Sequence, residues 1–91
     1  MLTKKMFRAE ILGTVPNGLT ENDVFAIVGS AMRESHKVQS VTKRRLSGGM
    51  VSIVVVFEAY DSVLAGASLQ YARNSVGGFS ADIIGPREIR G

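Results

Sequence analysis

The spacing of apolar residues along the chain predicts a small domain that alternates strands and helices. Period-2 alternation indicates half-buried strands, and apolar residues at i, i+3, i+4 and i+7 indicate amphipathic helices. The nearly continuous β-branched segment before Phe57 is the strongest strand signal. We expect strands over residues 6–15, 38–46, 50–57 and 79–84, and helices over residues 21–35 and 62–76.

Turn and cap residues separate these elements. Thr20 and Asp23 have the spacing of a capping box at the start of the first helix, and Asp61 can cap the second. Gly48-Gly49 suits a hairpin connection. Gly85-Pro86 is expected to close the last strand.

The order β-α-β-β-α-β predicts a ferredoxin-like α+β fold, a two-layer sandwich of one antiparallel sheet and two helices. Right-handed crossovers favour the strand order 4-1-3-2, with both helices on one face. We expect all 91 residues to form a single domain.

The other sheet face stays open in such a fold, and the third strand suggests a use for it. Its odd-numbered residues 51–57 should face the helices, leaving Ser52, Val54 and Val56 on the open face. A strand apolar on both faces is usually covered on both, although exposed valines are also ordinary surface. The expected polar rim comprises Arg8, Glu10, Ser40, Thr42, Ser80 and Asp82. We predict a partner-binding site of Ser52, Val54, Val56, Arg8 and Glu10.

Two segments carry a resemblance to a known family. Val15-Pro16-Asn17-Gly18-Leu19-Thr20-Glu21-Asn22-Asp23-Val24 and the passage from Gly49 through Ala59 into Asp61-Ser62 resemble an RNA recognition motif. The resemblance implies the same fold, in which members stack bases on strand aromatics. The matching positions here are Ile11, Ser52 and Val54, which are not aromatic. The lack of aromatic residues at these positions therefore argues against the family's usual mode of RNA binding. Family members without these rings often bind proteins instead.

The charge of the chain leaves a nucleic-acid function open. The net charge is +3, and Lys43-Arg44-Arg45 is the densest basic run. This run could contact phosphates, or could simply protect an edge strand from pairing. Lys4, Lys5, Arg87 and Arg90 should lie at the opposite end of the sheet, so the positive charge is divided.

Few residues suggest catalysis. The chain has no cysteine, which excludes disulfides and thiolate chemistry and fits a reducing compartment, so we expect a cytoplasmic location. The longest apolar run, 53–57, is too short to span a membrane, and no apolar segment follows the basic N-terminal residues, so we expect no signal peptide. His36 is interpreted as a surface residue near a helix end, without a nucleophile beside it. We expect no catalytic residue, metal or cofactor.

Three hypotheses follow. The leading one is a non-enzymatic interaction module that self-associates or docks a protein partner through the open face or an edge strand. The alternative is weak, salt-sensitive nucleic-acid binding through Lys43, Arg44 and Arg45. The third is an enzyme whose site forms between subunits, for which the sequence names no residues.

Overall fold

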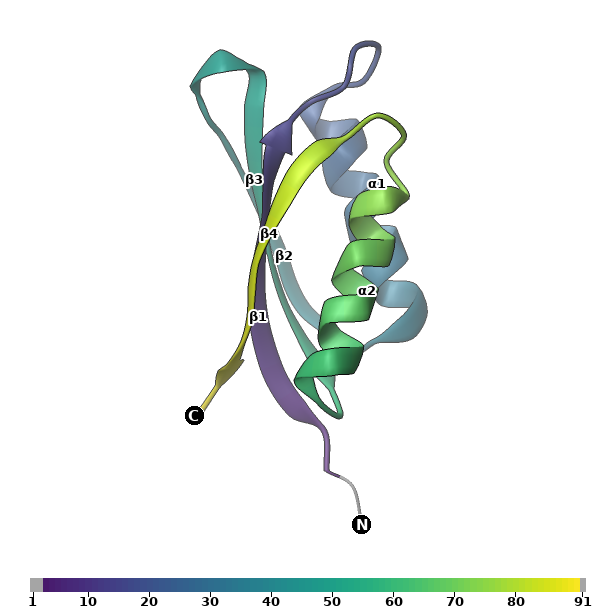
Figure 1. The fold of residues 1–91 in the computed structure, drawn as a ribbon, viewed down its shortest axis with the longest axis vertical. Coiled ribbons are helices and arrows are strands. Elements are labelled where there is room, and N and C mark those ends of the chain that lie inside the picture. Colours follow the sequence, from purple (N-terminus) through teal and green to yellow (C-terminus); the bar gives the residue numbers. More distant parts are fainter. Residues whose placement is uncertain (1–2, 91) are drawn as a thin grey trace.

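The computed structural model describes residues 3–90, which form one sheet with two helices packed on one face (Figure 1). The elements are β1 (Lys5–Thr14), α1 (Glu21–Ser35), β2 (Val38–Arg45), β3 (Met50–Ala59), α2 (Ser62–Asn74) and β4 (Ser80–Ile89), with a short 3-10 turn at Ser47–Gly49. The strand order is β2-β3-β1-β4, and every pairing is antiparallel. The predicted ferredoxin-like fold, strand order and one-sided helix layer are confirmed.

The core lies between the sheet and the helices. The odd-numbered residues of β3 from Val51 to Phe57, which were predicted to face the helices, are fully buried. They pair with the inward-facing residues of β1, among them Ile11. Val28 and Leu69 fill the core from α1 and α2. Each such side chain gains about 1.5–3 kcal/mol from leaving water, so this layer provides most of the drive for folding.

The predicted helix starts are confirmed. The hydroxyl of Thr20 accepts from the Asp23 amide at 3.1 Å, and the Asp23 carboxylate accepts from the Thr20 amide at 2.8 Å. The Asp61 carboxylate accepts from the Leu64 amide at 2.8 Å. Each contact satisfies a helix N–H that has no partner within its own helix.

A bulge in β2 corrects one predicted alternation. Val38 pairs with Phe57 and Ser40 with Val56, so Gln39 is an extra residue on β2. Strict alternation along β2 would place Val38 on the same face as Ser40. The bulge turns Val38 to the helix side instead, where it packs against the core together with Val41.

A second bulge extends β4 beyond its predicted end. Arg8 pairs with Arg87 and Glu10 with Ile84, so two residues, Gly85 and Pro86, lie opposite Ala9 alone. The prediction that Gly85-Pro86 ends the strand was wrong, because β4 continues to Ile89. Pro86 is accommodated since β4 is an edge strand, where a missing N–H breaks no ladder.

The apolar stripe predicted for the second helix is only partly buried. Ala65, Leu69 and Ala72 face the core. Val63 is 78% exposed and Tyr71 is 55% exposed, so both lie on the outer surface. The helix also ends at Asn74, slightly before the predicted 76.

Candidate functional site

The open face of the sheet brings the predicted binding residues together. Within the described residues, no helix covers this side of the sheet, which is the left side in Figure 1. Val54 pairs with Glu10 and Val56 with Arg8, so these four residues form a block at the centre of the sheet. Thr42 and Ser40 flank the valines from β2. The sequence therefore placed this group correctly.

Ser52 lies deeper than its position suggests. It is only 3% exposed, and its hydroxyl donates to the Glu10 carboxylate across the β1–β3 pairing. A hydrogen bond to a charged acceptor is stronger than one between neutral groups. It fixes the carboxylate beside Val54, on the floor of the open face.

Residues from β4 complete this face, and the sequence reasoning missed most of them. Ile84 lies opposite Glu10, Arg87 opposite Arg8 and Ile89 opposite Met6. Ile84 is 52% exposed and Ile89 is 38% exposed. Arg87 and Ile89 could not be placed from alternation, because the Gly85-Pro86 bulge shifts the pattern by one residue. The predicted rim residues Ser80 and Asp82 lie on β4 opposite Thr14 and Leu12, two strands from the valines.

The basic run is divided between the two sides of the sheet. Arg44 pairs with Ser52 on the open side, whereas Lys43 and Arg45 pair with the inward-facing Ile53 and Val51. Arg45 is also occupied by Glu21. The three side chains do not form one patch, although Lys43 and Arg44 remain exposed at the edge.

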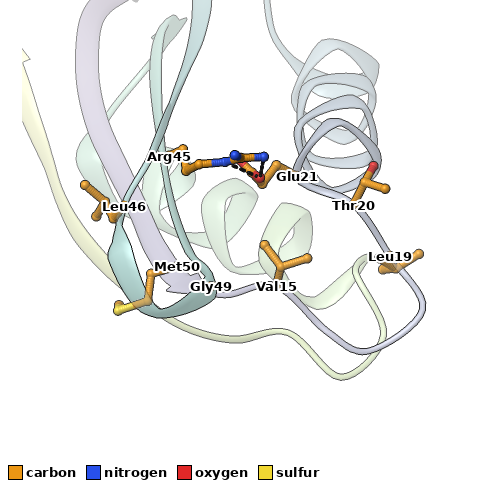
Figure 2. Close-up of a pocket in the computed structure, with 8 residues that line it drawn as sticks. All are labelled: Val15, Leu19, Thr20, Glu21, Arg45, Leu46, Gly49 and Met50. Atoms are coloured by element: carbon orange, nitrogen blue, oxygen red, sulfur yellow. Dashed lines mark hydrogen bonds and ion pairs between the residues drawn. The ribbon is translucent and has the colours of Figure 1, made fainter.

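A hollow lies at the hairpin end of the molecule, between the β1–α1 loop and the β2–β3 connection (Figure 2). Its volume is about 430 Å³, and its apolar lining includes Val15, Leu19, Leu46 and Met50. The Glu21–Arg45 pair forms one wall, with Nη2 of Arg45 2.6 Å from Oε1 of Glu21. The hydrogen bond and charge of Arg45 lower the pKa of Glu21 below its usual 4.5, and Glu21 raises the pKa of Arg45.

His36 has a partner that the sequence did not reveal. Its Nε2 lies 2.6 Å from the Ser68 hydroxyl, and its ring packs against Phe57. The expectation of an isolated surface histidine was wrong, because α2 brings Ser68 close from 32 positions away. This contact joins the end of α1 to α2. No carboxylate bonds to His36 within residues 3–90, so a triad is not assembled in that part of the chain.

The structure corrects one position in the resemblance to RNA recognition motifs. Ile11 is fully buried and faces the helices, so it cannot offer a base-stacking surface. The open-face residues of β1 beside Ser52 and Val54 are Leu12 and Glu10. None of these four is aromatic. Among residues 3–90 there is also no cluster of three or more metal-ligating side chains, and no helix has the length and apolar character needed to cross a membrane.

Comparison with solved structures supports the fold. The ACT domain from the GTP pyrophosphokinase of Chlorobium tepidum superposes with a TM-score of 0.64 at 11% identity, covering 90% of this chain and 100% of that one. An uncharacterized protein from Thermotoga maritima superposes with a TM-score of 0.58 at 13% identity, covering 97% of this chain and 100% of its own. At such identities the likeness concerns the fold alone. No family model and no curated protein matches the sequence.

Proposed function

We propose that the protein is a non-enzymatic interaction module that binds a protein surface, either a second copy of itself or another protein, through the open face of the sheet. The observation that carries this proposal is the two-sided apolar character of β3. Its inward side is completely buried by the helices, while Val54 and Val56 on its other side are half-buried and no helix among residues 3–90 covers them. Central strands apolar on both faces are usually covered on both.

The surroundings of the valines fit a docking surface. Exposed Ile84 and Ile89 extend the apolar area along β4, and Arg8, Glu10 and Thr42 surround the centre with polar groups. An apolar centre within a polar rim is the usual anatomy of a protein interface. The two solved structures compared above contribute only the fold to this argument.

The face is a better candidate than either sheet edge. The edge strand β4 contains Pro86, which has no N–H to donate, and a bulge that shifts its register against β1. The other edge, β2, has its own bulge at Gln39 and ends in Lys43-Arg44-Arg45. Bulges, proline and clustered lysine or arginine all discourage addition of a further strand.

The test replaces Val54 by Asp and measures the assembly state by light scattering and partner retention by pull-down. A buried carboxylate at the centre of an interface is costly to desolvate, so we expect the Val54→Asp variant to lose self-association or the retained partner. The matched control is Val63→Asp, the same change at a site that is 78% exposed on α2, on the other side of the molecule.

Circular dichroism and thermal unfolding then show that both variants keep the fold. The proposal requires that only Val54→Asp loses the association. If wild type and both variants are monomeric and no partner is retained by any of them, the protein does not use this face as proposed.

A further inference from the structure

The bulge in β4 creates an unusual pair on the open face. With regular pairing from Ile84 onward, Pro86 would lie opposite Arg8 and Glu88 would follow on the same face. The extra residue instead places Arg87 directly opposite Arg8, and it places Glu88 opposite the buried Phe7 on the helix side. Two arginines thus face each other across β1 and β4, where like charges in such positions destabilise a sheet.

Nothing in the described chain neutralises this pair. Neither guanidinium lies within 4.0 Å of a carboxylate among residues 3–90. The neighbouring acids have other contacts: Glu10 accepts from Ser52, Glu58 lies 3.8 Å from Lys37, and Glu88 lies 3.8 Å from Arg90. No ion pair within this part of the protein therefore offsets the repulsion between Arg8 and Arg87.

The surface between the two arginines is hollow. Arg8, Ile84, Gly85 and Arg87 line a depression of about 240 Å³. Gly85 has no side chain to fill it, and its φ of 101° is a conformation that glycine adopts far more readily than other residues. Each guanidinium is a planar donor that matches the two oxygens of a carboxylate or phosphate.

We propose that Arg8 and Arg87 bind one oxyanion, the carboxylate or phosphate group of a ligand, in the depression beside Gly85. A negative group between the two guanidinium groups turns their mutual repulsion into two attractive contacts. Ile84 provides an apolar wall for the part of the ligand attached to the anion. This site lies within a single chain, so it does not require the proposed protein docking.

Titration followed by NMR tests the site. The full chain, ¹⁵N-labelled and kept in a buffer without phosphate, receives inorganic phosphate or acetate at constant ionic strength, with chloride as the reference anion. We expect saturable shifts at the amides of Gly85 and Arg87 and at Nε of Arg8. Stronger binding of phosphate identifies a phosphate ligand as the source, and stronger binding of acetate identifies a carboxylate.

Variants separate a specific site from general attraction. Arg87→Ala should weaken binding by about tenfold, as expected for the loss of one charged hydrogen-bonding group. The control Arg90→Ala removes the same charge from a residue near Glu88, outside the pair, and should leave the affinity within about twofold. Arg87→Glu should abolish binding and keep or raise the melting temperature, because Arg8 then faces an opposite charge.

Retained melting temperature in Arg87→Glu shows that its loss of binding does not come from unfolding. Shifts equal to those with chloride, or equal weakening by Arg87→Ala and Arg90→Ala, would overturn the site. The titration measures anion binding to a single chain, so it does not depend on association. A protein that proves monomeric in the Val54 experiment can still bind the anion, and a protein that associates can still fail to bind it.

Discussion

Gln39 and Gly85 show how single residues determine the chemistry of the open face. Each belongs to a bulge on an edge strand, and each bulge reverses the alternation on one side of it relative to the other. Gln39 moves Val38 into the core layer. The Gly85-Pro86 bulge brings Arg87, in place of a proline, opposite Arg8.

The first prediction concerns the backbone conformation of Gly85, which only glycine adopts without strain. A Cβ at this position would lie 3.1 Å from the Arg8 carbonyl oxygen, and the φ of 101° is unfavourable for other residues. Gly85→Ala should therefore lower the free energy of unfolding by about 1–3 kcal/mol, measured by urea denaturation.

Gly77→Ala is the control for this substitution. Gly77 is not among the glycines with positive φ, and no atom lies within 4 Å of the position its Cβ would take. Its substitution should change the free energy of unfolding by no more than about 1 kcal/mol in either direction. Equal destabilisation by the two changes would show that the bulge does not depend on glycine.

The sequence predicted the centre of the candidate site but not its edge. Val54 and Val56 follow from simple alternation along β3, because a long central strand without bulges keeps its period. Arg87 does not follow from it, since a glycine and a proline in an edge strand look like a strand end. Ser68 near His36 was also out of reach, because tertiary packing of the helices brings them together.

At the scale of elements, the start of α1 is held by two kinds of contact. The capping box satisfies its first N–H groups, and Glu21 in its first turn ties the helix to the end of β2 through Arg45. The capping residues were evident in the sequence because they are only three positions apart. The Glu21–Arg45 pair joins residues 24 positions apart and depends on where the hairpin ends relative to the helix.

The second prediction follows from the lowered pKa of Glu21. Because the carboxyl binds its proton less readily in the folded than in the unfolded protein, the ion pair contributes stability above the usual pKa of 4.5. This contribution is lost as pH falls through the lower folded pKa. Wild type should therefore be more stable than Glu21→Gln at pH 7, and the difference should shrink toward zero in strong acid.

Thermal unfolding of both proteins between pH 2 and pH 7, roughly the range over which carboxylates titrate, measures this difference. Arg45→Gln removes the hydrogen bond and the charge that lower the pKa, so it should remove most of the same pH dependence. Added salt should also reduce the effect, because Arg45 is exposed. A pH dependence that persists unchanged in Arg45→Gln would contradict the assignment.

At the scale of the molecule, the positive charges are spread over separate regions. Lys43 and Arg45 point toward the helix side of β2, Arg44 lies on the open side, and Arg8 and Arg87 lie on that same side near the opposite edge. Composition gave the net charge of +3, but only the sheet register shows that no single basic patch forms from the run at 43–45. This arrangement disfavours nucleic-acid binding relative to protein docking.

The third prediction puts a limit on any nucleic-acid binding that remains. From the open face, a duplex could meet Arg44, Arg8 and Arg87, but not Arg45, which is held by Glu21. Each phosphate contact contributes roughly −0.9 to the slope of log K against log salt, so the slope should be no steeper than about −3. Fluorescence anisotropy with a labelled duplex at several salt concentrations measures it.

Separate alanine variants of Lys43, Arg44 and Arg45 distinguish binding of the duplex from the open face from binding along the edge of β2. Binding from the open face requires Arg44→Ala to weaken affinity more than Lys43→Ala or Arg45→Ala, and the triple variant should lose little more affinity than Arg44→Ala alone. If the three single variants instead lose equal affinity, and the slope of log K against log salt is steeper than about −3, then the edge of β2 contacts the phosphate backbone. That result would favour the nucleic-acid alternative. Affinity that is indifferent to all three changes would remove that alternative and leave the open face to a protein partner.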